Sequence, residues 1–154
     1  HFIEAGVDTG DIILQKKFAI GTEDYILHVQ ARMLTIYKTI VVEALELLES
    51  DSFRAMKQDH EQVSYFGPLK KADREIDLSR SSKEIYDLIR AVSLPYKGAF
   101  YKEYVIWAAG IGEDKILVEK YKNVGLYCEE AEDRVIIRLK DGCLVSEDFE
   151  IKKD

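Results

Sequence analysis

The stretch His1-Phe-Ile-Glu-Ala-Gly-Val-Asp-Thr-Gly-Asp-Ile-Ile-Leu-Gln15 decides how the chain is interpreted. Two apolar runs, residues 1–3 and 12–14, flank a loop with a glycine on each side of its centre. Glycine lets the backbone turn sharply, so the pattern predicts a strand, a loop and a second strand, with Asp8 at the tip of the loop. A carboxylate in that place can orient a base or a reacting amine. A plain Asx-type turn is the alternative interpretation of Asp8-Thr9-Gly10.

The segment that follows predicts a long helix and then a linker. A second strand is expected over residues 11–20, and Gly21-Thr22-Glu23-Asp24 then begins the helix. Glu23 and Asp24 are favourable there, because the N-terminal end of the helix dipole is positive and stabilises negative charge. Apolar residues recur at three-, four- and seven-residue steps, which predicts one buried stripe: Leu27, Leu34, Tyr37, Val41, Ala44 and Leu48. The regular spacing of apolar residues ends after Ser50, which predicts a linker. Tyr65 and Phe66 are interpreted as side chains that anchor this linker by packing, and the alternative is that they line a cleft.

A short amphipathic helix begins after Ser81. Ser81 and Glu84 have the spacing of a capping box. Apolar residues at Ile85, Leu88, Ile89 and Val92 follow at i, i+3, i+4 and i+7, and Pro95 ends the pattern. Arg90 falls outside the apolar stripe, so we expect a solvated cation and keep a cation that reaches into a cleft as the alternative.

The last part of the chain changes to short runs rich in β-branched and aromatic residues. Asp141-Gly142 is a hairpin signal between two of these runs. About five short strands at even spacing predict a small, partly open barrel of OB type. The expected strands are Tyr104–Ala109, Ile116–Tyr121, Gly125–Cys128, Arg134–Leu139 and Cys143–Phe149, with Gly110-Ile111-Gly112 expected in a turn.

Composition is that of a globular protein of one ordinary domain or two small ones. The 154 residues are 47% hydrophobic and 33% charged, with a formal charge of −7. That charge disfavours a nucleic-acid reader, and no apolar run is long enough for a membrane helix. Cys128 and Cys143 lack a metal-binding context, so we expect reduced thiols, a cytoplasmic protein and no metal. His28 and His60 are isolated and are interpreted as helix-surface residues.

Several motifs together resemble one family, the folate-dependent formyltransferases. In the opening stretch, His1, Asp8, Gly10 and Gln15 match the active-site loop of that family. Further matches extend over nearly all of the chain: Ile76-Asp77, Leu88-Ile89-Arg90-Ala91, Pro95-Tyr96-Lys97-Gly98-Ala99-Phe100, Val105-Ile106-Trp107 and Asp141-Gly142-Cys143. The chain also begins without Met, inside an expected strand, so we expect it to be the C-terminal part of a longer protein.

The resemblance implies an α/β architecture in two parts. Residues 1–63 would be the C-terminal piece of a Rossmann-like catalytic domain, residues 64–80 a linker, and residues 81–154 an OB-like barrel domain. Catalytic roles would belong to His1 and Asp8. The backbone of Glu4, Ala5, Gly6 and Asp8 would contact N10-formyltetrahydrofolate, the implied co-substrate. An Asn-x-His motif and a Ser-Leu-Leu-Pro loop are expected before His1, so we expect the chain alone to be inactive.

The implied acceptor is an amine. Two acceptors are weighed against each other, and a role of the barrel other than acceptor binding is the third possibility. Residues 99–154 carry nine Lys and Arg against thirteen Asp and Glu, a poor surface for tRNA. An amino group on a nucleotide-linked sugar is therefore the favoured acceptor, and initiator tRNA is the alternative. In a third reading the barrel serves chiefly as a dimerisation or binding module, which would make the protein a homodimer.

Overall fold

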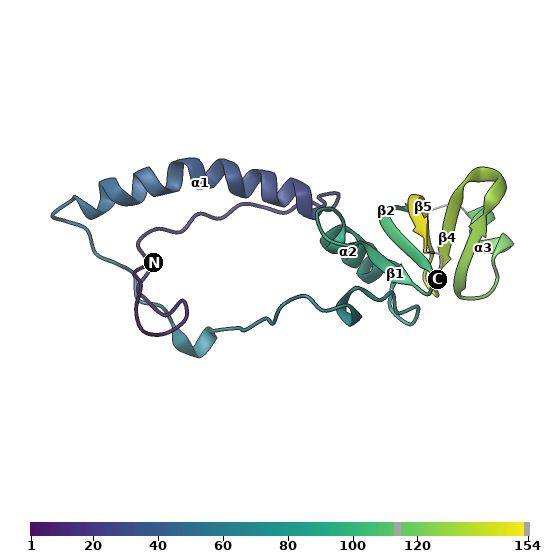
Figure 1. The fold of residues 1–154 in the computed structure, drawn as a ribbon, viewed down its shortest axis with the longest axis horizontal. Coiled ribbons are helices and arrows are strands. Elements are labelled where there is room, and N and C mark those ends of the chain that lie inside the picture. The colour runs from purple at the N-terminus through teal and green to yellow at the C-terminus, as the bar shows by residue number, and fades with distance from the viewer. Residues whose placement is uncertain (113–114, 153–154) are drawn as a thin grey trace. The chain divides into compact units, whose positions relative to one another are not determined.

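The structure is a computed structural model that describes residues 1–112 and 115–152 (Figure 1). Its contacts separate the chain into two compact units, and each is interrupted in sequence. The first unit comprises His1–Gly21 and His28–Pro68, and the second comprises Thr22–Leu27 and Leu69–Asp154. Across the described residues, no helix is both long and apolar enough to cross a membrane.

Residues 1–20 contain no strand, so the prediction of two strands around the Asp8 loop is wrong. The backbone there is irregular, and its one ladder contact is an antiparallel bridge between Ile12 and Met56. Two hydrogen bonds form this bridge, Ile12 N to the Met56 carbonyl at 2.8 Å and Met56 N to the Ile12 carbonyl at 2.9 Å. A strand needs a neighbour along its whole length, and within the described residues this segment pairs at that one point.

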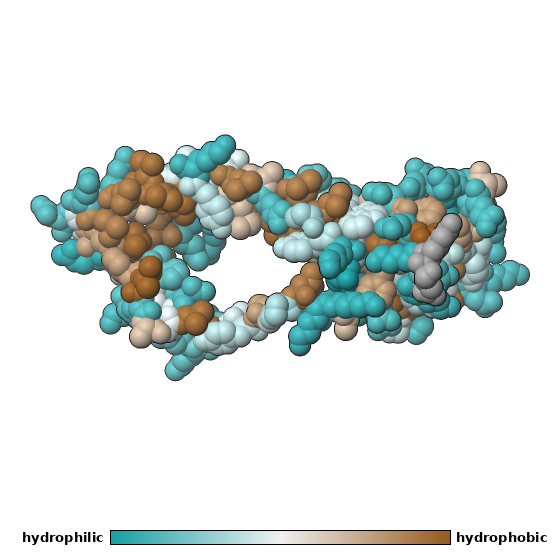
Figure 2. Space-filling model, in the orientation of Figure 1, coloured by the Kyte–Doolittle hydropathy of each residue, from teal (hydrophilic) through white to brown (hydrophobic). Residues whose placement is uncertain are grey.

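The long helix α1 spans Ile26–Leu48 and begins later than predicted. Glu23 and Asp24 precede it, and its first turn holds no acidic residue. The apolar stripe is present but exposed, which contradicts the prediction that it is buried: Leu34 is 62% exposed and Val41 59%. Figure 2 shows hydrophobic side chains gathered on the surface of this part of the chain. Periodicity identified the helix correctly, but a stripe is buried only where a second surface covers it.

The second unit is built on an open, five-stranded antiparallel half-barrel (Figure 1). Its strands lie in the order β1-β2-β5-β4-β3, with all four pairings antiparallel. The strands are β1 Ala99–Tyr101, β2 Tyr104–Gly112, β3 Gly125–Glu129, β4 Arg134–Arg138 and β5 Cys143–Ile151. The predicted fold class is confirmed in outline, with helices in the first part of the chain and a small, partly open barrel after them.

Two details of the predicted strand list are wrong. Residues expected as strand Ile116–Tyr121 form helix α3, Lys115–Lys120, and only Leu117 is buried in it. Gly110-Ile111-Gly112 lies inside β2 instead of in a turn, while the short strand β1 was not predicted. The hairpin at Asp141-Gly142 is confirmed, and Leu139 N donates to the Gly142 carbonyl at 2.8 Å to close it.

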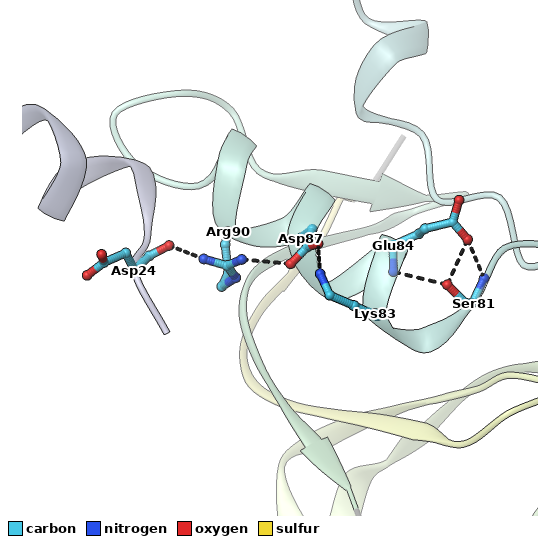
Figure 3. Close-up of polar contacts among 6 residues, drawn as sticks. All are labelled: Asp24, Ser81, Lys83, Glu84, Asp87 and Arg90. Carbon is cyan, nitrogen blue, oxygen red and sulfur yellow. Dashed lines mark hydrogen bonds and ion pairs between the residues drawn. The ribbon is translucent and has the colours of Figure 1, made fainter. Parts of the chain in front are cut away.

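Helix α2, Ser82–Val92, covers the sheet as its sequence predicts. The capping box is complete, because Ser81 Oγ accepts from Glu84 N while the Glu84 carboxylate accepts from Ser81 N (Figure 3). The helix buries Ile85, Tyr86, Ile89 and Val92. These pack with strand and linker residues into one core: Ile76, Ala99, Ile106, Val135, Ile137, Leu139 and Leu144.

Residues 22–27 belong to the second unit because they bind to α2 and β2. Tyr86 donates to the Glu23 carboxylate at 2.6 Å, and burial together with this bond raises the pKa of Tyr86 to about 12. Tyr25 Oη accepts from Ala109 N and donates to the Ala109 carbonyl, both at 3.1 Å. The β2–β5 ladder shifts register on either side of Ala108, and the irregularity leaves Ala109 without a cross-strand partner. The Tyr25 hydroxyl therefore provides hydrogen-bond partners for the Ala109 N–H and C=O, which have none on the neighbouring strand.

Arg90 is part of the same contact, which contradicts the prediction of a solvated cation. Its side chain is 12% exposed. It donates to the Asp24 carbonyl and pairs with Asp87 at 2.6 Å (Figure 3), and its guanidinium lies 5.1 Å from the Tyr86 ring centroid. Arg90 lies off the apolar stripe of α2 because a segment distant in sequence covers it there.

Candidate functional site

The loop around Asp8 is closed by backbone contacts. Phe2 N donates to the Asp11 carbonyl at 2.9 Å, which brings the two ends of the loop together. Gly10 is buried at this closure, and a Cβ there would lie 1.9 Å from the Phe2 carbonyl oxygen. Only glycine fits such a close approach of backbone to backbone. Asp8 has a φ of 55°, the left-handed region that aspartate tolerates better than most residues.

His1 and Asp8 meet across this loop. Nε2 of His1 lies 3.3 Å from Oδ1 of Asp8, and Nδ1 of His1 lies 2.9 Å from the Phe2 carbonyl oxygen. A neutral imidazole carries one N–H, so only the imidazolium form can donate to both oxygens. Both side chains are accessible, with the Asp8 carboxylate 82% exposed. The arrangement is a carboxylate–imidazole pair within reach of solvent.

The side chain of Gln58, which is distant in sequence, also holds the loop. Its side-chain amide donates to the Asp8 carbonyl at 2.9 Å and to the Gly10 carbonyl at 2.6 Å. These bonds fix the backbone on both sides of Thr9. Sequence reasoning missed this residue, because about fifty positions separate Gln58 from the loop and no local pattern marks the contact.

A cavity of about 460 Å³ lies beside Asp8. The loop contributes Val7, Asp8 and Thr9 to its wall. The rest comes from Gln58, Asp59, His60, Gln62, Val63, Ser64, Tyr65 and Phe66. Tyr65 is 78% exposed and Phe66 91% exposed, so the prediction that they anchor the linker is wrong and the alternative, lining a cleft, is the one observed.

The remaining predicted contact residues, Glu4, Ala5 and Gly6, lie on the exposed side of the same loop. Among the described residues, their backbone N–H and C=O groups take part in no intramolecular hydrogen bond. Such groups are available to a ligand with its own donors and acceptors. Within those residues the structure also contains no cluster of three or more His, Cys, Asp or Glu that could hold a metal ion.

The chemical capacity of this site follows from these groups. A carboxylate–imidazole pair can move a proton to or from a reacting amine, and exposed backbone amides can orient a planar ligand. The cavity beside Asp8 lies within the usual size range of small-molecule sites.

Comparison with known proteins identifies proteins to which this chain is similar. Residues 68–153 match the C-terminal domain of formyl transferases. The methionyl-tRNA formyltransferase of Fusobacterium nucleatum is 29% identical over 148 residues, which cover 94% of this chain and 47% of that protein. The enzyme of the same name from Carboxydothermus hydrogenoformans is 36% identical over 116 residues, 73% of this chain and 37% of that protein.

Two solved structures share the fold. One is a sugar 3N-formyl transferase solved in the presence of dTDP and 5-N-formyl-THF, with a TM-score of 0.70 and 24% identity, covering 98% of this chain and 53% of that one. The other is the N-formyltransferase from Helicobacter canadensis in complex with folinic acid and dTDP-3-aminofucose, with a TM-score of 0.67 and 21% identity, covering 96% and 53%. The chain thus spans about half the length of the proteins it matches.

Proposed function

Because this chain belongs to the formyl transferase family, whose C-terminal domain spans residues 68–153, we propose that it is part of an enzyme that moves a formyl group from N10-formyltetrahydrofolate to an amine. In this proposal residues 1–63 complete a catalytic domain, residues 64–80 link it to the barrel, and residues 81–154 are the barrel domain. The observation that carries the proposal is the His1–Asp8 pair beside a cavity of about 460 Å³.

The roles of the individual residues follow from the chemistry of formyl transfer. An amine that attacks a formyl carbonyl must lose a proton, and the carbonyl oxygen gains negative charge. Asp8, paired with His1, would orient the group that takes the proton. The unpaired backbone of Glu4, Ala5 and Gly6 suits the pterin of the co-substrate. A donor for the developing oxyanion remains to be supplied by another part of the enzyme.

The favoured acceptor is an amino sugar linked to a nucleotide. Support comes from the negative charge of residues 99–154, which disfavours a polyanion. Further support comes from the two solved relatives, of which one is a sugar 3N-formyl transferase and the other was solved with dTDP-3-aminofucose. Initiator tRNA is the second candidate, because the relatives with 29% and 36% sequence identity are methionyl-tRNA formyltransferases.

Formyl transfer by the complete enzyme, measured with each acceptor, tests the proposal. Asp8→Asn keeps the shape of the side chain and removes its charge, so we expect the rate to fall by about 10²- to 10⁴-fold. Asp11→Asn is the matched control, three positions away in the same loop, and should stay near the original rate. An Asp8→Asn enzyme as fast as this control would refute the assignment, and transfer to tRNA alone would refute the sugar acceptor.

The isolated chain provides a separate test. We expect its 154 residues to form no formylated product, because Asp8 and His1 supply only one part of the machinery that the reaction needs. Detectable product from the isolated chain would show that this division of labour is wrong.

A further inference from the structure

A second cavity, of about 380 Å³, lies wholly within the second unit and collects positive charge. Four cationic side chains line it: Lys70, Lys71, Arg74 and Lys97. Its other described lining residues, which include Tyr96, are apolar or aromatic, and none of the described residues in the lining is acidic. Such a combination suits a ligand that has both an anionic and a planar apolar part.

Contacts in this region hold the cations close to one another. Lys71 Nζ lies 5.5 Å and Arg74 Cζ 5.7 Å from the centroid of the same ring, Phe100. Arg74 Nη1 also donates to the carbonyls of Lys97 and Gly98, at 2.9 and 2.8 Å. The guanidinium therefore joins the turn at Ala72–Arg74 to the loop that carries Lys97. A guanidinium has five N–H donors, so others can still donate to a ligand.

Within the described residues, none of these four cations forms an ion pair with a carboxylate. The ion pairs found there are made by other lysines and arginines. An acidic side chain lies beside the four cations, because the Asp73 carboxylate accepts the backbone N–H of Lys70 at 2.7 Å. Glu75 lines a different cavity. Like charges gathered around a partly apolar cavity repel each other, and a bound anion would remove that cost.

We propose that this cavity binds the diphosphate group of a small nucleotide. Lys70, Lys71, Arg74 and Lys97 would contact the phosphate oxygens. The Tyr96 ring, 41% exposed, would stack on the base. A long polyanion fits less well, because it would extend from this cavity onto the acidic residues 99–154. A nucleotide is also part of the favoured acceptor, so this choice of ligand rests on the proposed function. The proposal uses no residue of the Asp8 site, however, and the two can fail separately.

Calorimetric titration of the chain with thymidine diphosphate, inorganic pyrophosphate and thymidine tests it. We expect thymidine diphosphate to bind more tightly than either of its parts. Lys70→Gln with Lys71→Gln should weaken its binding by about tenfold or more, since hydrogen bonds between ionised groups are the strong ones. Lys122→Gln with Lys140→Gln removes the same charge from exposed sites in the same unit, and should change affinity less than about twofold.

Two further variants and a titration with an RNA hairpin separate this cavity from other sites. Tyr96→Leu should reduce the affinity for thymidine diphosphate to that for pyrophosphate, while circular dichroism shows that the fold is kept. Asp8→Asn should leave the affinity unchanged. Loss of binding in Asp8→Asn would place the nucleotide in the first unit and overturn the proposal without touching the proposed transfer. Absence of binding, equal losses in the two double variants, or tighter binding of an RNA hairpin would also overturn it.

Discussion

Glu129 gives the sharpest test of how charge stabilises the barrel. Its carboxylate, at the end of β3, is 8% exposed and accepts from three side chains. One is Lys120, the second is Tyr121 Oη at 2.5 Å, and the third is Arg134 Nε at 2.5 Å. Lys120 first, and then Tyr121 and Arg134, lower the pKa of Glu129 from 4.5 to about 2. We predict that Glu129→Gln, which keeps the shape and removes the charge, destabilises the second unit.

The size of the effect follows from that pKa. Each pKa unit corresponds to about 1.4 kcal/mol, so the shift sets an upper bound of about 3.5 kcal/mol. Because the Lys120 side chain is 53% exposed, solvent screens part of the attraction, and we expect a loss of about 2 kcal/mol at pH 7. The folded pKa lies below the unfolded one. The stabilisation is therefore complete above about pH 4.5 and disappears as the pH falls from there to about 2.

Urea unfolding followed by the fluorescence of Trp107 measures this effect, because the single tryptophan of the chain lies in β2. Glu132→Gln is the matched control: Glu132 pairs with the same Arg134 but is 54% exposed, and should contribute less than about 0.5 kcal/mol. Equal stability of Glu129→Gln and the original protein at pH 7 would refute the reasoning. A deficit that does not shrink between pH 5 and pH 3 would refute it as well.

Three other substitutions have clear expected outcomes. Ser81→Ala removes the cap of α2 and should cost about 1 kcal/mol by urea unfolding, whereas Ser81→Thr should cost less. Ile89→Ala opens a hole at a fully buried position and should cost about 2–5 kcal/mol by the same measurement; a cost below about 1 kcal/mol would contradict the packing. Gly10→Ala places a methyl group 1.9 Å from the Phe2 carbonyl oxygen, so formyl transfer by the complete enzyme should fall while the helical circular dichroism is unchanged. An active Gly10→Ala enzyme would show that the loop tolerates rearrangement.

Elements with local signals could be predicted from the sequence. Helix α2 has a capping box and a regular apolar period, and the β4–β5 turn has Asp141-Gly142. Helix α3 was missed because a short apolar run suits either a strand or a helix. Its state is decided by tertiary packing, since Leu117 is buried against Ile136 and Cys143. Distant contacts decide the environment of Arg90 too, because Asp24 lies far away along the chain.

The candidate site shows the same division. Asp8 and the glycines around it form a local turn pattern, and the resemblance to a family drew attention to His1. The contribution of residues 58–66 could not be predicted, because it depends on how a segment of low periodicity folds back onto the loop. Gln58 has no motif of its own, and its role comes only from the two carbonyls that its amide reaches.

The attachment of residues 22–27 to α2 and β2 has a practical consequence for anyone who wants the barrel alone. A gene fragment that starts at residue 68, where the family match begins, would express a barrel whose Tyr86, Arg90 and Ala109 have lost the groups they bind. To restore these contacts, the six residues would have to be fused back or supplied as a peptide. During synthesis on the ribosome, residues 22–27 leave the exit tunnel long before α2 and β2. The barrel can therefore bind this segment as soon as α2 and β2 emerge.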